Sequence, residues 1–172
     1  MILREAILKE HSKAQATQVI KWIGHDAKRL KALVELFLTD EYRVVQRAAR
    51  IVSMVAEQYP HLLTSYLPDM LAHCEAPDLP VAVKRNVVRM LQHIEIPESV
   101  HGTTMNLCFQ VLSDPKETVA VRCFSMSVLA RLALHYPELK QELNCVIKDA
   151  LQYELVSAAF KARAKKVLDQ IK

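Results

Sequence analysis

The chain has 172 residues, of which 51% are hydrophobic, only 6% are aromatic and two are glycine. Sandwiches, barrels and nucleotide-binding α/β folds need glycine at tight turns or beside phosphates, so this scarcity disfavours them and favours helices. The net charge of +4 is lower than we expect of a protein that binds nucleic acid through many phosphate contacts.

Apolar residues at helical spacing predict two helices before residue 40. The first contains Val19, Ile20, Trp22 and Ile23, and Gly24 is well placed to end it. A second helix is expected from about Asp26 onward. Its apolar stripe comprises Leu30, Leu33, Val34, Phe37 and Leu38.

Three dipeptides that end in proline then divide the chain. They are Tyr59-Pro60, Ile96-Pro97 and Tyr136-Pro137, and their prolines lie 37 and 40 residues apart. Proline lacks an N–H group and suits the first turn of a helix, so each dipeptide predicts a joint between two helices.

The apolar pattern before each joint repeats along the chain. Val52, Leu91, Leu129 and Leu168 follow one another at intervals of 39, 38 and 39 residues. Earlier in the same helices, Val44, Val83, Val121 and Phe160 are in register. We call these the first helices of each repeat, and we expect all eight residues to be buried.

A second helix follows each joint, and short polar links separate one repeat from the next. The second helices carry stripes such as Leu67, Met70 and Leu71, or Leu143, Ile147 and Ala150. The links include 39–41, 76–80, 113–116 and 152–154. Their Asp and Ser side chains are expected to cap the helices that follow.

Helix pairs of about 40 residues with a proline-marked joint resemble HEAT repeats of the HEAT/armadillo class. Asp114-Pro115 and Val121-Arg122 match that family's loose pattern best, followed by Val83-Lys84, whereas Val44-Val45-Gln46 lacks the basic residue. The resemblance implies one domain over 1–172, an all-α right-handed superhelix (solenoid) of about four helix pairs plus a terminal helix. An irregular helical bundle is the alternative, which four in-register helices disfavour.

Two positions inside second helices are irregular. Pro68 predicts a kink or a helix that restarts with Ser65 as its cap, and Gly102 with the threonines after it predicts a similar late start. A shaped binding notch at either place is the alternative interpretation.

No residue pattern for catalysis or metal binding is present. The seven histidines lack zinc-ligand spacing, and the chain has no phosphate loop or nucleophile elbow. Cys74, Cys108, Cys123 and Cys145 lie far apart in apolar runs, which predicts buried free thiols. We expect a protein without enzymatic activity, metal or cofactor.

The expected location is cytoplasmic. Segment 1–10 alternates charged and apolar residues, unlike a signal peptide, and no run approaches the roughly 18 apolar residues of a membrane span.

The resemblance places second helices on the concave side of the superhelix. Exposed residues opposite their apolar stripes form a ridge of mixed charge, rich in amides, which suits hydrogen bonding to a partner polypeptide. The predicted ridge comprises Lys31, Glu35, Asp69, His73, Thr103, Asn106, Gln110, Asn144 and Lys148. A protein-interaction scaffold or adaptor is therefore the leading functional hypothesis.

A basic set on the first helices, which the resemblance places on the convex side, supports a second hypothesis. It comprises Arg43, Arg47, Arg50, Lys84, Arg85, Arg89, Arg122 and Arg131. These residues predict a nucleic-acid-associated protein if they bind phosphates, but arginine and lysine also favour helices without any partner.

Overall fold

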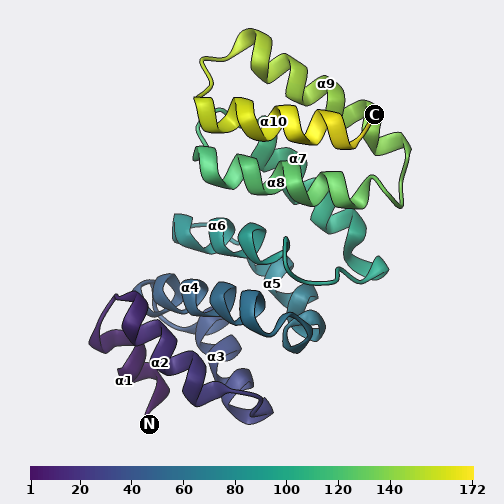
Figure 1. Ribbon diagram of the computed structural model, residues 1–172. Helices are drawn as coiled ribbons and strands as arrows, with labels where there is room; N and C mark the ends of the chain where they lie inside the picture. The colour runs from purple at the N-terminus through teal and green to yellow at the C-terminus, as the bar shows by residue number, and fades with distance from the viewer. The chain divides into compact units, whose positions relative to one another are not determined.

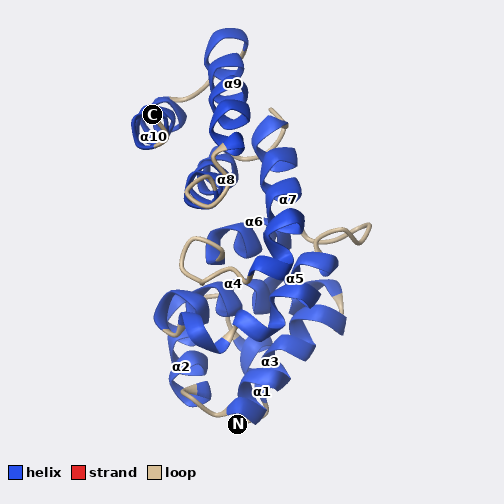
Figure 2. Cartoon of the chain, turned by 90° about the vertical axis from the view of Figure 1, so that its right-hand side faces the viewer, coloured by secondary structure: helices blue, strands red, loops and turns tan.

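The computed structural model describes residues 1–172, and its contacts divide them into two compact units, Met1–Pro97 and Glu98–Lys172. Every regular element in both units is helical, as Figure 2 shows. The predicted all-α class is therefore confirmed. That residues 1–172 form a single domain stays a prediction.

The first unit, unit 1, places its helices in two layers (Figure 1). In one layer α4 packs against both α2 and α6. In the other layer α3 contacts α5, and α3 also packs against α4 of the first layer. The elements are α1 (Leu3–Lys9), α2 (Lys13–Ile23), α3 (Ala27–Thr39), α4 (Tyr42–Gln58), η1 (Pro60–Leu62), η2 (Thr64–Tyr66), α5 (Leu67–His73) and α6 (Val81–Met90).

The second unit, unit 2, repeats this arrangement around α8. α8 packs beside α10, with α7 and α9 on the other side (Figure 2). Its elements are η3 (Glu98–Val100), α7 (His101–Ser113), α8 (Val119–Leu132), α9 (Glu138–Tyr153) and α10 (Ala158–Gln170). In chain order, α2 to α10 therefore alternate between first and second helices and end on a first helix, which is the predicted order.

The in-register apolar positions lie in the core, with one exception. Val44, Val83, Val121 and Phe160 are all buried. Val52, Leu91 and Leu129 are buried too, but Leu168 is half-buried and that part of the prediction is wrong. α10 packs against α8 and α9, whereas α4 is covered by α1, α2, α3 and α6, so less of the α10 surface is enclosed.

Local signals start and stop several helices as the sequence predicts. Gly24 ends α2 with φ of +51°, a conformation that side-chain-bearing residues rarely adopt. Asp26 caps α3 by accepting from the N–H groups of Lys28 and Arg29 at 2.9 and 3.1 Å. Ser157, which lies outside the predicted links, also caps α10 by accepting from the N–H group of Phe160.

Other predicted caps are wrong. Asp40 and Asp114 accept from backbone N–H groups inside their own links, at Glu41 and Lys116, and neither caps the helix that follows. Ser65 lies in a 3₁₀ turn and caps nothing, although the helix does restart with Pro68 in its first turn. The carboxylates of Asp40 and Asp114 bond to N–H groups within their own links instead of to the first turn of the next helix.

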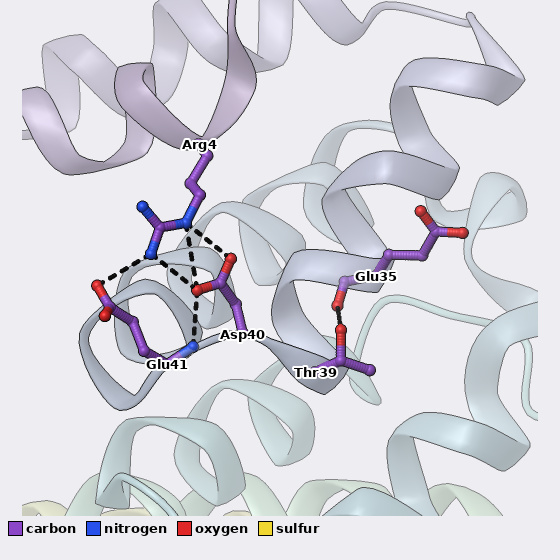
Figure 3. Close-up of polar contacts among 5 residues, drawn as sticks. All are labelled: Arg4, Glu35, Thr39, Asp40 and Glu41. Carbon is purple, nitrogen blue, oxygen red and sulfur yellow. Dashed lines mark hydrogen bonds and ion pairs between the residues drawn. The ribbon is translucent and has the colours of Figure 1, made fainter.

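The sequence did not predict α1, which side chains of later elements hold in place. Arg4 reaches the link between α3 and α4, where its guanidinium lies 3.0 Å from Asp40 and 3.1 Å from Glu41 (Figure 3). Arg47 of α4 donates to the carbonyl oxygens of Ile7 and Leu8, in the last turn of α1. A cation at this position complements the negative end of the helix dipole.

Truncation of the repeated leucines tests the packing. We expect Leu129→Ala to lower the free energy of unfolding by about 2–5 kcal/mol, because a fully enclosed side chain leaves a cavity. Leu168→Ala should cost clearly less, because its side chain is half-buried. Urea unfolding of both variants measures the difference, and equal losses would contradict the packing described for α10.

Candidate protein-interaction surface

The unit 1 part of the predicted ridge lies on α3 and α5. Lys31 and Glu35 are exposed and form an ion pair of 3.7 Å one helical turn apart, and Asp69 is exposed on α5. Figure 3 shows the Glu35 side chain pointing away from Arg4 and Asp40. An exposed pair of this kind contributes little stability, so both charges stay available to a partner.

His73 is not the exposed ridge residue that the sequence predicts. Its ring is half-buried and meets the Phe37 ring edge-on, with the centroids 5.2 Å apart. Its Nε2 atom is buried without a hydrogen-bond partner, and burial lowers the pKa of the imidazole. His73 therefore packs at the contact between α3 and α5, where burial favours its neutral form.

The unit 2 part of the ridge lies on α7 and α9, which contact each other. Thr103, Asn106 and Gln110 follow one another at helical spacing on α7, with Asn144 and Lys148 on α9. The amides of Asn106 and Gln110 are exposed, that of Asn144 is half-buried, and none of the three hydrogen-bonds within the chain. Unit 2 therefore presents unsatisfied amide donors and acceptors on two neighbouring helices.

Three members of the predicted basic set bond to other groups of the chain and do not lie free on the surface. Arg47 holds α1, as described above. Arg89 of α6 donates to Glu57 of α4 at 2.9 Å. Arg122 is only 5% exposed. The predicted exposure is therefore wrong for these three residues, because arginine side chains are long enough to bond neighbouring helices.

Arg122 is the most enclosed charge of the set. Its guanidinium forms two hydrogen bonds with Glu154, at 2.7 and 3.1 Å, and donates to the Leu112 carbonyl at 2.8 Å. It also lies 4.7 Å from the centre of the Phe160 ring. Arg122 thus joins α7, α8, the α9–α10 link and α10, and Glu154 neutralises its charge.

The remaining basic residues are more accessible. Arg43 and Arg85 are exposed, while Arg50, Lys84 and Arg131 are half-buried. Burial lowers the pKa of Arg131. Unit 1 therefore keeps a reduced basic surface on α4 and α6.

Sequence reasoning missed a pocket in unit 2, at the end of α7 and α9. It has a volume of about 230 Å³ and is lined in part by Ser113, Arg122, Asp149, Tyr153 and Glu154. Tyr153 is 76% exposed. The exposed tyrosine in a polar link was the available signal, but the proximity of Ser113, 40 residues earlier in the chain, could not be inferred from it.

The cysteines and histidines form no candidate metal centre, since no three metal-binding side chains converge. Cys74, Cys108 and Cys123 are buried free thiols, as predicted, and burial raises the pKa of Cys74 to about 12. Cys145 is exposed on α9, so its predicted burial is wrong. A cysteine in an apolar run can still fall on the outer face of its helix.

A comparison with protein families decides what kind of repeat this is. A family model described as "HEAT repeat domain" matches residues 3–171. The chain belongs to the HEAT repeat family. The resemblance inferred from the proline joints and the Val121-Arg122 pair is confirmed. No curated protein and no solved structure matches the chain.

The helices of this HEAT repeat chain were also compared with what a membrane span requires. None combines the length and the apolar character needed to cross a bilayer.

The role of Arg122 can be tested by truncation. We expect Arg122→Ala to lower the free energy of unfolding by about 3–5 kcal/mol, because it leaves the partly buried Glu154 carboxylate without a partner. The matched change Arg43→Ala, at an exposed position, should stay within about 0.5 kcal/mol of the unchanged protein. Guanidinium unfolding measures both, and a small effect at Arg122 would contradict its structural role.

His73 predicts a pH dependence of stability. Its pKa in the folded protein lies below the ordinary 6.5, so the unfolded chain binds the proton more readily. This contribution to the free energy of unfolding is complete above pH 6.5 and is lost as the pH falls toward the folded-state pKa. Relative to His73→Leu, the unchanged protein should therefore lose stability between about pH 7.5 and 5. Urea unfolding at both pH values measures this, and a constant difference would refute it.

Proposed function

We propose that this HEAT repeat protein is a non-catalytic scaffold that binds a segment of a partner polypeptide along its second helices. The supporting observation is the set of amides on α7 and α9. Asn106, Gln110 and Asn144 lie on neighbouring helices, and each has donor and acceptor groups that the chain leaves unpaired. An extended or helical segment presents backbone and side-chain groups that such amides can hydrogen-bond.

The basic set supports the nucleic-acid alternative less well. Phosphate binding needs several accessible cations, because each neutralised phosphate releases counterions and adds to affinity. Arg122, Arg89 and Arg47 are committed to a carboxylate or to carbonyl oxygens inside their units. Only Arg43 and Arg85 of the eight are exposed. A polypeptide partner is therefore the better-supported proposal, and the cytoplasmic location stays a prediction.

A comparison of two surface variants tests the proposal. We expect the triple change Asn106→Ala, Gln110→Ala and Asn144→Ala to weaken capture of the protein partner isolated from the native cell with the unchanged chain. Each lost hydrogen bond should lower affinity by roughly twofold to tenfold. The matched change Arg43→Glu with Arg85→Glu should leave capture nearly unchanged. The measurement is quantitative mass spectrometry of crosslinked complexes, with nuclease treatment as a control.

Titration with random-sequence DNA and RNA tests the alternative directly. Binding at about 50 mM salt that falls steeply by about 200 mM and disappears in the Arg43 and Arg85 variant would favour nucleic acid. Equal capture by the amide variant and the unchanged chain would overturn the proposed ridge.

A further inference from the structure

Two arginines of this chain are held by the same three kinds of group. The Arg29 guanidinium lies 4.5 Å from the centre of the Trp22 ring and 3.3 Å from the Asp26 carboxylate, and it donates to the Trp22 carbonyl at 2.6 Å. That carbonyl lies in the last turn of α2. Each of these groups favours a planar cation. The ring stacks on it, the carboxylate pairs with its charge, and the carbonyl lies at the negative end of a helix dipole.

Arg122 repeats this arrangement in unit 2. Its ring is Phe160, its carboxylate is Glu154, and its helix-terminal carbonyl belongs to Leu112 in the last turn of α7. The two sites come from unrelated sequence positions and from different units. The arrangement therefore occurs at two independent sites in this chain.

The pocket beside Arg122 offers a third set of the same groups. Tyr153 supplies an exposed ring, and Asp149 lies one turn earlier on α9, so that both project from one side of the helix. α7 ends at Ser113 and α9 ends at Tyr153, so the negative ends of two helices lie at the pocket. Neither Asp149 nor Tyr153 is bonded to another side chain of this protein.

The charge balance of the pocket favours a cation over an anion. Arg122 and Glu154 pair with each other through two hydrogen bonds and cancel. Asp149 then leaves the lining with a net negative charge. The volume of the pocket is about 230 Å³. Pockets for whole small-molecule ligands have roughly 300–1,000 Å³, so this pocket suits a single side chain.

The pocket also continues the amide ridge. Asn106, Gln110 and Ser113 follow at intervals of four and three residues on α7, which places them along one face of that helix. Ser113 lines the pocket. A polypeptide lying along this row would therefore reach the pocket at one end.

We propose that this pocket binds an arginine side chain of the partner polypeptide, with its guanidinium stacked on Tyr153 and paired with Asp149. The inference rests on the proposed function and names the chemistry of the partner: a segment that carries an arginine. A lysine side chain would bind more weakly, because its ammonium group lacks the planar face that stacks on the ring.

The pocket can be tested without knowing the partner, by nuclear magnetic resonance titration of the full chain with N-acetyl-arginine amide. We expect saturable shifts at the backbone amides of Ser113, Asp149 and Tyr153. N-acetyl-citrulline amide, which has nearly the same shape but no charge, should cause none of them. Asp149→Asn and Tyr153→Ala should each weaken binding by about threefold, the effect of losing one exposed charge or one stacked ring.

The matched control is Asp169→Asn, which removes an exposed carboxylate on α10 of the same unit and should leave arginine binding unchanged. Shifts of equal size with citrulline, or an unchanged affinity in both pocket variants, would overturn the inference. So would the absence of saturable shifts up to the solubility limit. Both altered side chains are exposed, so a preserved amide spectrum confirms that each variant is folded.

The amide-ridge and arginine experiments fail independently. If the arginine probe binds but the amide variant captures its partner normally, the pocket stands and the proposed ridge falls. If the amide variant loses its partner while the probe does not bind, the ridge stands and the inference about arginine falls.

Discussion

Helices of 7 to 17 residues cannot bury an apolar stripe alone, and two helices here have more apolar surface than a single neighbour can cover. α4 buries residues from Val44 to Ala56 beneath α1, α2, α3 and α6. α8 does the same among α7, α9 and α10. Each compact unit is therefore organised around one central helix, and the surfaces available for function are those that this packing leaves outside.

Arginine side chains form hydrogen bonds with carbonyl and carboxylate groups of the elements that pack together. Arg47 binds the carbonyl end of α1, Arg89 pairs with the preceding first helix, and Arg122 connects four elements of unit 2. Such side chains have aliphatic stems that lie on apolar surface and heads that find carbonyls or carboxylates. A mildly basic sequence can therefore have little accessible positive charge, which is why net charge is a poor guide to its partner.

The proposed partner surface rests on polar groups of the second helices. The amides of Asn106, Gln110 and Asn144 and the carboxylate of Asp149 lie on α7 and α9, the second helices of unit 2. The proposed recognition of a partner by this HEAT repeat chain depends on these groups. Amides provide hydrogen bonds that salt screens weakly, and the proposed arginine pocket at their end would add a preference for a cation.

The local chemistry of the sequence determined the repeat length, the helix pairs and most of the core. Proline and glycine act on their own backbone, so the joint at Tyr59-Pro60 and the helix end at Gly24 needed no distant partner. The spacing of Val52, Leu91 and Leu129 predicted burial, because a helix turns at a constant 3.6 residues.

Only the tertiary structure decided which polar side chains and cysteines remain accessible to solvent. Arg122 is buried because Glu154 and Phe160, more than 30 residues later, close around it. His73 is half-buried because Phe37 of another helix covers it, while Cys145 lies on the open side of α9. Ser113 meets Tyr153 in one pocket because α7 and α9 end side by side. These outcomes depend on which side chain a neighbouring helix presents, and the helical period does not contain that information.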